Sequence, residues 1–151
     1  MKKLGILLIV GILSACSSGP HHSQAVKRTD YEPLAVNTDQ GQLNATIYAP
    51  ENVYFTEVDA TKLDGIKHLR FFANGFPNSI YLSPGSHSIQ MWKDGNPDFD
   101  LHLHSIKLEA NQNYYVNYET IQKGKRVRIV YWVENMGTGE VIYGKKPENE
   151  K

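Results

Sequence analysis

Between Gly41 and Tyr143, apolar and polar residues alternate with a period of two along most of the chain. Gly, Pro, Asn and Asp interrupt this alternation about every 8–12 residues. Side chains two residues apart on a strand point to the same face, so the pattern predicts strands with one buried face. Many short strands separated by regular turns are typical of a sandwich or a barrel. We therefore expect an all-β fold, an antiparallel β-sandwich in a single domain.

The turn residues divide this region into separate segments. A short helix is the one helical element considered, at 59–63. No segment shows a long 3.6-residue period. The expected strands are 42–49, 52–58, 66–73, 79–83, 86–93, 99–109, 113–120, 125–134 and 139–143.

The apolar residues set a register for the hairpin that turns at residues 121–124. Opposing Thr120 to Lys125 pairs the apolar residues of the two strands and places Glu119 opposite Arg126. We therefore interpret the basic run in this hairpin as a solvated end with one cross-strand ion pair, rather than as an anion-binding site. The run consists of Lys123, Lys125, Arg126 and Arg128.

A second hairpin joins the segments 86–93 and 99–109. Opposing Met91 to Phe99 pairs the apolar residues of its two strands. Beyond His104 the apolar residues change from odd to even positions. A β-bulge near His104–Ser105 would produce this change of phase.

The N-terminus has the pattern of an export signal. Two lysines follow Met1, and residues 4–13 form an apolar run that is too short to span a bilayer. We expect residues 1–15 to be a cleaved signal peptide and residues 16–33 to be a flexible tether, which would reach about 50 Å if extended. The sandwich domain is expected at 34–144, followed by a disordered tail at 145–151.

Leu13-Ser14-Ala15-Cys16 resembles the lipobox of bacterial lipoproteins, and Cys16 is the only cysteine in the chain. The resemblance implies cleavage between Ala15 and Cys16, with a diacylglycerol and an N-acyl chain then attached to Cys16. Several acyl chains together make a firm membrane anchor, whereas a single chain is marginal. Lipoproteins of Gram-negative bacteria that stay at the inner membrane tend to have Asp after the cysteine. The chain has Ser17 there, which resembles the outer-membrane class facing the periplasm.

The charge of the chain bears on its partners. Removing residues 1–15 takes away two of the 16 basic residues and none of the 16 acidic residues, so the remainder carries a formal charge of −2. A nucleic-acid partner would call for a basic domain, so none is expected. The net charge also predicts no strong overall attraction to anionic lipid.

Trp92, Trp132 and Tyr115 are expected on outward faces of the sheets in these registers. Exposed aromatic rings among hydrogen-bonding side chains suit a glycan, such as peptidoglycan, or an envelope protein. A covering tether or tail would explain the same tryptophans without any ligand.

Asp100-Leu101-His102-Leu103-His104 places two imidazoles on one face of a strand, a spacing that can chelate zinc. The expected register directs His87 to the opposite face, so a third ligand is missing. We therefore expect a polar, solvent-facing edge and no metal, while a metal-dependent hydrolase using His102 and His104 stays the alternative.

Within Ser83-Pro84-Gly85-Ser86-His87, the pair Pro84-Gly85 lies between two expected strands, and Pro-Gly is typical of a type II turn. Together with the later strands, this motif resembles the PEGA-like and carboxypeptidase-regulatory-like modules of bacterial lipoproteins over residues 41–135. The expected sandwich is of Ig/transthyretin-like type. Such modules are usually non-catalytic, and the resemblance brings no catalytic residue or cofactor beyond the lipid on Cys16. We therefore expect a lipid-anchored cell-envelope protein with a non-enzymatic binding or structural role, possessing no enzyme activity.

Overall fold

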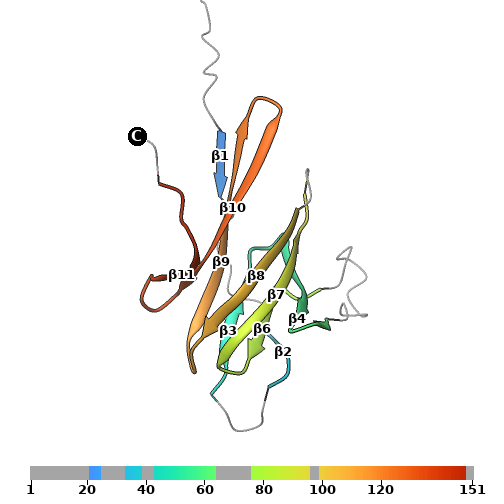
Figure 1. Cartoon of the computed structure of the whole chain (residues 1–151), viewed down its shortest axis with the longest axis vertical. Coiled ribbons are helices and arrows are strands. Elements are labelled where there is room, and N and C mark those ends of the chain that lie inside the picture. The colour runs from blue at the N-terminus through green and yellow to red at the C-terminus, as the bar shows by residue number, and fades with distance from the viewer. Residues whose placement is uncertain (1–20, 25–32, 39–42, 64–75, 96–98, 149–151) are drawn as a thin grey trace, which may run out of the picture.

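The computed structural model describes residues 21–24, 33–38, 43–63, 76–95 and 99–148, which form two β-sheets and no helix (Figure 1). This confirms the prediction of an all-β, sandwich-like single domain. The strands are β1 (His21–Gln24), β2 (Leu34–Ala35), β3 (Ala45–Tyr48), β4 (Val53–Val58), β5 (Thr61–Lys62), β6 (Ser79–Leu82), β7 (Gly85–Lys93), β8 (Phe99–Leu108), β9 (Asn113–Lys123), β10 (Arg126–Asn135) and β11 (Val141–Gly144).

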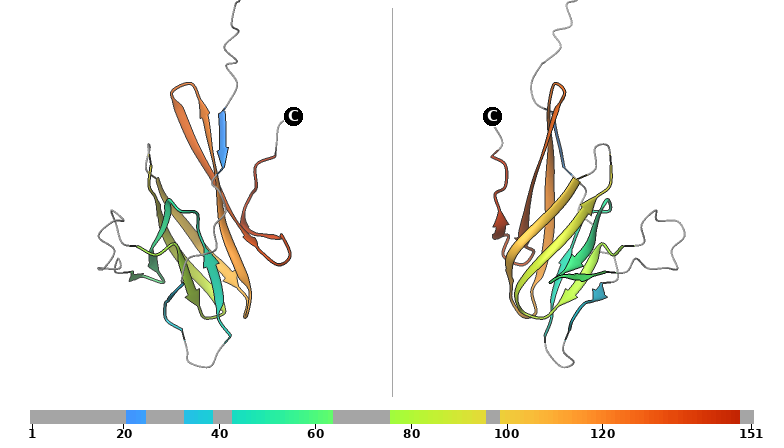
Figure 2. Two further views of the ribbon diagram at one scale, coloured as in Figure 1. Left: turned by 180° about the vertical axis from the view of Figure 1, so that it is seen from behind. Right: turned by 45° about the vertical axis from the view of Figure 1, so that its right-hand side comes forward.

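The two sheets differ in size. The larger has the order β11-β10-β9-β3-β6-β2 with β1 added on β9, and the smaller has the order β5-β4-β7-β8. Most neighbours are antiparallel, but β2 with β6 and β3 with β9 pair in parallel. On β9, residues 113–115 pair with β3 and residues 119–122 pair with β1. The end of β9 and the start of β10 project beyond the sandwich as a hairpin (Figure 2).

The inward faces of the two sheets pack together into one apolar core. Fully buried side chains come from both sheets, including Ile47, Phe55, Ile80, Ile89 and Val116. The alternation in the sequence produces this core, because every second residue of each long strand points inward.

The predicted β-bulge near His104–Ser105 is confirmed. Leu103 pairs with Ile89 and Ile106 pairs with His87, so two residues of β8 lie opposite one residue of β7. Ser105 has a φ of 53°, which a bulged residue can adopt. The bulge keeps the apolar side chains of β8 inward on both sides of the phase change.

The predicted register of the β9–β10 hairpin is wrong by four residues, although the predicted faces are right. Thr120 lies opposite Ile129, and Glu119 lies opposite Val130 instead of Arg126. The expected Glu119–Arg126 ion pair is therefore not a cross-strand pair. The cause is a two-residue turn that begins at Gly124, which has a φ of 61°, as a glycine at the first central position of a type II′ turn does.

The β7–β8 register is also shifted from the prediction, here by two residues. Met91 lies opposite Leu101, and Phe99 lies opposite Lys93. A shift of two preserves the faces, since the side-chain period of a strand is two.

The helix considered at 59–63 does not form. Asp59 and Ala60 have φ values of 48° and 62°, and they join β4 to β5 with Val58 opposite Thr61. Positive φ at both central residues is typical of a type I′ hairpin turn, which short antiparallel strands favour.

Some predicted segments fall outside the described residues. They include the strand at 66–73, the signal peptide at 1–15 and the lipidation position Cys16. Within the predicted tether, residues 21–24 form β1 on the edge of β9, so this part of the segment belongs to the sheet.

Two tyrosines of the other sheet form hydrogen bonds with backbone groups on the outer edge of β8. The hydroxyl groups of Tyr131 and Tyr143 donate to the carbonyl oxygen of His102 at 2.8 and 3.1 Å. The His104 N–H donates to the Tyr143 hydroxyl oxygen at 3.2 Å. Because unpaired edge groups invite pairing with another chain, these tyrosines protect the edge as well as linking the sheets.

Candidate functional site

Trp92 lies on the outward face of the smaller sheet, near the end of β7, and is partly exposed. In register it stands between Tyr54 on β4 and Asp100 on β8. The Tyr54 and Trp92 rings are 6.0 Å apart between centroids and inclined by 30°. Tyr54 is buried and packs beside the indole, while part of the Trp92 side chain stays exposed.

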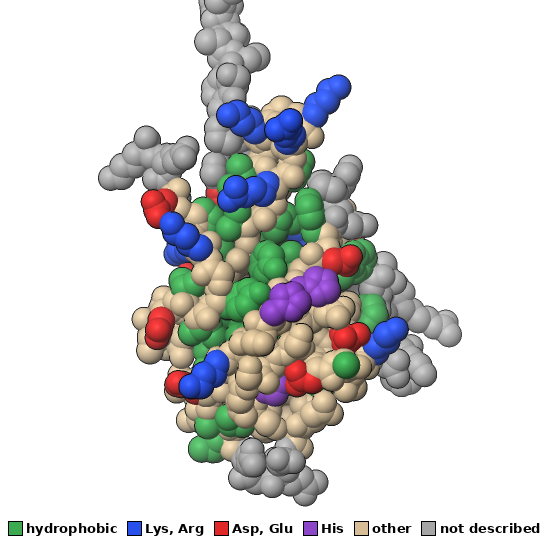
Figure 3. Space-filling view, in the orientation of Figure 1, with side chains coloured by type: hydrophobic (Ala, Val, Ile, Leu, Met, Phe, Trp, Pro, Cys, Tyr) green, Lys and Arg blue, Asp and Glu red, His purple; other side chains and the backbone are tan. Residues whose placement is uncertain are grey.

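Polar side chains surround this aromatic pair. The Gln90 side-chain amide donates to the Glu57 carboxylate at 3.0 Å, and Gln90 lies opposite His102. Asp100 is exposed beside Trp92. Figure 3 shows histidine and acidic side chains gathered over β7 and β8. We call the surface formed by Tyr54, Glu57, Gln90, Trp92, Asp100 and His102 the Trp92 face.

His102 and His104 come together at the edge of this face, as the sequence predicts. Their rings stack at 5.8 Å between centroids with an interplanar angle of 15°. The nitrogen lone pairs lie in the ring planes, so the lone pairs of two stacked, nearly parallel rings lie in separate planes and do not converge on one ion. Among the residues that the structure describes, no group of three or more His, Cys, Asp or Glu could hold a metal ion.

The prediction of Trp132 and Tyr115 as parts of a binding surface is wrong, and for Trp132 the alternative of a covering tail holds. Their exposed fractions are 2% and 1%, although both lie on the outward face of the larger sheet. The Trp132 indole N–H donates to the Glu134 carboxylate at 2.9 Å, and the Lys146 ammonium donates to the same oxygen at 3.3 Å. The chain after β10 folds back as β11, with Gly144 opposite Trp132. The C-terminal segment thus contributes to covering this face, and neither ring can serve as an open binding surface.

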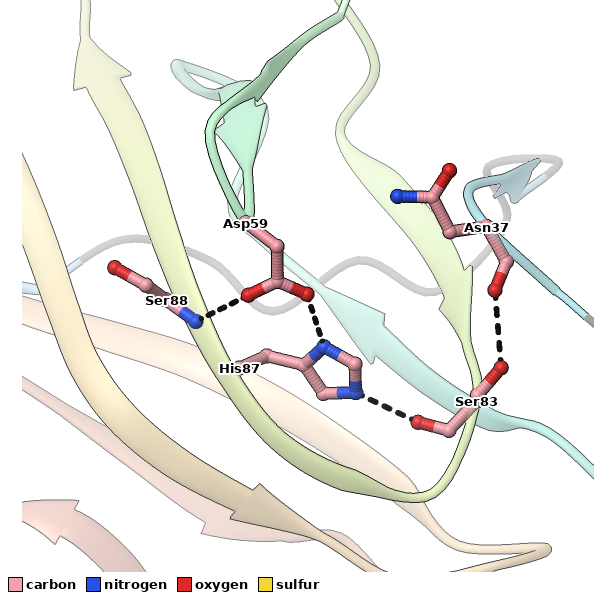
Figure 4. Close-up of polar contacts among 5 residues, drawn as sticks. All are labelled: Asn37, Asp59, Ser83, His87 and Ser88. Atoms are coloured by element: carbon pink, nitrogen blue, oxygen red, sulfur yellow. Dashed lines mark hydrogen bonds and ion pairs between the residues drawn. The ribbon is translucent and has the colours of Figure 1, made fainter.

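His87 belongs to a polar cluster that the sequence did not reveal (Figure 4). Its Nδ1 lies 2.7 Å from the Asp59 carboxylate, and its Nε2 lies 2.7 Å from the carbonyl oxygen of Ser83. Since a carbonyl oxygen only accepts, Nε2 carries a proton. The imidazole thus bridges the Asp59 carboxylate and the Ser83 backbone. Asp59 is 28 residues away in the sequence, so no local motif could have pointed to the pair.

The Asp59 carboxylate is held in its charged form. Partial burial alone would raise the pKa of Asp59, but hydrogen bonds from the Ser88 N–H and from His87, with the charge of that imidazole, outweigh burial and lower the pKa. The Ser88 N–H donates to the carboxylate at 2.8 Å. The pair therefore joins the β4–β5 turn to the start of β7.

This cluster contains Ser, His and Asp, but it does not have the geometry of a hydrolase triad. The Ser83 hydroxyl donates to the carbonyl oxygen of Asn37 at 3.0 Å, on the side away from the imidazole (Figure 4). His87 Nε2 faces the Ser83 carbonyl and not its hydroxyl. A general base must reach the proton that it removes, so the arrangement serves to fix loops and not to activate a serine.

No helix in the described part of the chain is long and apolar enough to cross a membrane. Comparison with known proteins gives no match to this chain among family models, curated proteins or solved structures.

Proposed function

We propose that this protein is a lipid-anchored cell-envelope protein whose β-sandwich is a non-enzymatic binding module for a glycan. Cys16 would carry the acyl chains, and the Trp92 face would contact the ligand. The lipobox at residues 13–16 supports the anchor. The observation that carries the binding role is the partly exposed Trp92 ring, held against Tyr54 among polar side chains.

The chemistry of the Trp92 face favours a sugar chain. A pyranose ring presents C–H groups on its faces and hydroxyl groups around its edge. The indole face accepts the C–H groups, while carboxylate, amide and imidazole groups beside it pair with hydroxyls. Glu57, Gln90, Asp100 and His102 supply these groups. With Ser17 after Cys16, the expected location is the periplasmic face of the outer membrane, where peptidoglycan is the glycan within reach.

The anchor is tested in cells grown with radiolabelled palmitate. We expect the wild-type chain to be labelled and to fractionate with membranes. Cys16→Ser should accumulate as an unlabelled, uncleaved precursor, because only the thiol accepts the diacylglycerol. Ser17→Ala, which keeps the lipobox intact, should behave as wild type. Equal labelling of Cys16→Ser and wild type would refute the anchor.

The ligand is tested by sedimentation of the detergent-extracted protein with purified peptidoglycan. Trp92→Ala should weaken binding about tenfold or more, as loss of a central aromatic contact typically does. Tyr81→Ala is the matched control, because Tyr81 is an aromatic residue of β6 in the larger sheet and is 38% exposed. Equal binding of both variants would exclude the Trp92 face as the binding surface.

The same preparation tests the hydrolase alternative by metal analysis. Stoichiometric zinc that disappears in a His102→Ala/His104→Ala variant would contradict the non-enzymatic proposal.

A further inference from the structure

The projecting end of the β9–β10 hairpin is strongly basic. Its four cationic side chains are all exposed, and Figure 3 shows Lys and Arg gathered at this end of the molecule. Among the described residues, no ion pair joins any of them to an acidic side chain. We call this group the basic tip, and it consists of Lys123, Lys125, Arg126 and Arg128.

The register places like charges face to face in the basic tip. Lys123 lies directly opposite Arg126, and Arg128 lies opposite the apolar Ile121. Like charges opposite each other on neighbouring strands destabilise a hairpin. Their repulsion is relieved when an anionic surface is present, so the arrangement favours an anionic partner over solvent alone.

β1 fixes where the N-terminal chain leaves the domain. It runs antiparallel to β9, with His21 opposite Gln122 at the tip and Gln24 opposite Glu119 toward the body (Figure 1). The chain that precedes His21 therefore joins the domain at the basic tip. Cys16 is five residues earlier, a span of at most about 18 Å. An anchor at Cys16 and the basic tip must lie at the same end of the molecule.

We propose that the basic tip docks on anionic phospholipid headgroups of the membrane that holds the acyl chains of Cys16. This inference rests on the proposed lipid anchor. Lipid anchors gain stability and orientation from a second, polybasic signal next to the acyl chains. The net charge of the whole chain is near zero, but surface attraction acts within about a Debye length and depends on the local charge. The opposite end of the sandwich then points away from the bilayer.

The docking is tested with the acylated full-length protein reconstituted in lipid vesicles. A Gln122→Cys variant places a fluorescent label at the tip, and Ala110→Cys places one in the β8–β9 turn at the other end of β9. The acylated Cys16 is a thioether, so the new thiol is the only site for the label. Energy transfer from the label to acceptor-labelled headgroups reports how close each end lies to the membrane.

We expect strong transfer from the tip label, and not from the Ala110→Cys label, in vesicles that contain phosphatidylglycerol. The transfer should fall in pure phosphatidylcholine and when salt rises from about 0.05 to about 0.5 M. Each basic residue near an anionic surface contributes a factor of about five to the docking equilibrium. Lys123→Gln/Lys125→Gln should therefore reduce docking about 25-fold. The control Lys62→Gln/Lys107→Gln removes the same charge from exposed positions of the smaller sheet and should leave docking unchanged.

Two outcomes distinguish a failure of the docking from a failure of the proposed lipid anchor. Tip transfer that is the same in both kinds of vesicle, or in both double variants, would overturn the docking while leaving the anchor intact. Failure of the wild-type chain to enter vesicles, with Cys16 itself open to thiol labelling, would overturn the anchor and the docking together.

Discussion

Among the glycines that the structure describes, Gly144, the last residue of β11, is the one where an added methyl group should destabilise the fold most. Its φ is 72°, and a Cβ atom there would lie 2.5 Å from the Tyr131 carbonyl oxygen and 3.2 Å from the Trp132 Cα. Both neighbours are backbone atoms, which cannot rotate away. Gly139 provides a matched control, because its φ is 74° and a Cβ atom there would meet nothing within 4 Å.

The two glycines separate backbone strain from collision. Left-handed backbone destabilises an L-residue by roughly 1–2 kcal/mol, so Gly139→Ala should lower the free energy of unfolding by about that amount. Gly144→Ala has the same strain plus overpacking against β10, which typically adds about 1–3 kcal/mol. At about 4 °C per kcal/mol for a domain of this size, the extra loss is roughly 4–12 °C in Tm.

The assay is denaturant unfolding in a Trp92→Phe background, which leaves Trp132 as the only tryptophan. Gly144→Ala should push β11 away from β10 and expose the Trp132 indole to acrylamide before global unfolding. Gly139→Ala should leave the indole protected. Equal stability losses in the two variants, with equal protection of Trp132, would refute the collision argument.

Three further predictions concern the turns and the edge of β8. The pKa of Asp59 in the folded protein is lowered from 3.8. The charged carboxylate therefore stabilises the fold above pH 3.8, and this stabilisation is lost as the pH falls through the folded pKa. Urea unfolding from pH 7 to 2 should show this loss in wild type and not in Asp59→Asn. Ala60→Gly relieves a φ of 62° and should raise the free energy of unfolding by about 1 kcal/mol in thermal melts, whereas an unchanged Tm would contradict the strain. Tyr143→Phe removes the hydroxyl shared by His102 and His104; stability should fall by about 1 kcal/mol with faster amide exchange at His104, and unaltered exchange would argue against the edge contact.

The strands and their faces were predictable because alternation is a local signal. In β8, Leu101 and Leu103 are buried before the bulge, and Ile106 and Leu108 are buried after it. The change from odd to even positions locates the bulge from the sequence alone, since only an inserted residue keeps both pairs inward.

The registers were less predictable, since alternation fixes parity but not position. Tyr118 faces Tyr131, four residues away from the expected Val127, and every side chain still lies on its predicted face. Any shift by an even number satisfies the apolar pattern equally well. The two-residue turn at Gly124 decides among these registers through its backbone geometry, as the pair Asp59 and Ala60 does for β4 and β5.

The candidate site was predictable in part for a related reason. Alternation places Trp92 and Trp132 on outward faces, but it does not say what lies over each face. Trp132 is buried, with β11 paired along its strand and its indole hydrogen-bonded to Glu134, while Trp92 packs beside Tyr54 and stays partly exposed. Coverage depends on segments distant in the sequence, and the His87–Asp59 pair escaped prediction for the same reason.

The position of β1 changes what the N-terminal segment can do for a lipid-anchored domain. A free tether over residues 16–33 would hold the domain up to about 50 Å from the bilayer and leave its orientation random. With residues 21–24 paired to β9, only the four residues 17–20 lie between Cys16 and the sheet. So short a link between the anchor and the sheet would restrict the orientation of the domain and would allow it little distance from the membrane. In the docked arrangement proposed above, the basic tip would meet the headgroups, and the Trp92 face on the smaller sheet would be held at a constant angle to the membrane. If instead the tip label and the Ala110→Cys label lay equally far from the bilayer, β1 would have to leave β9 in the anchored protein.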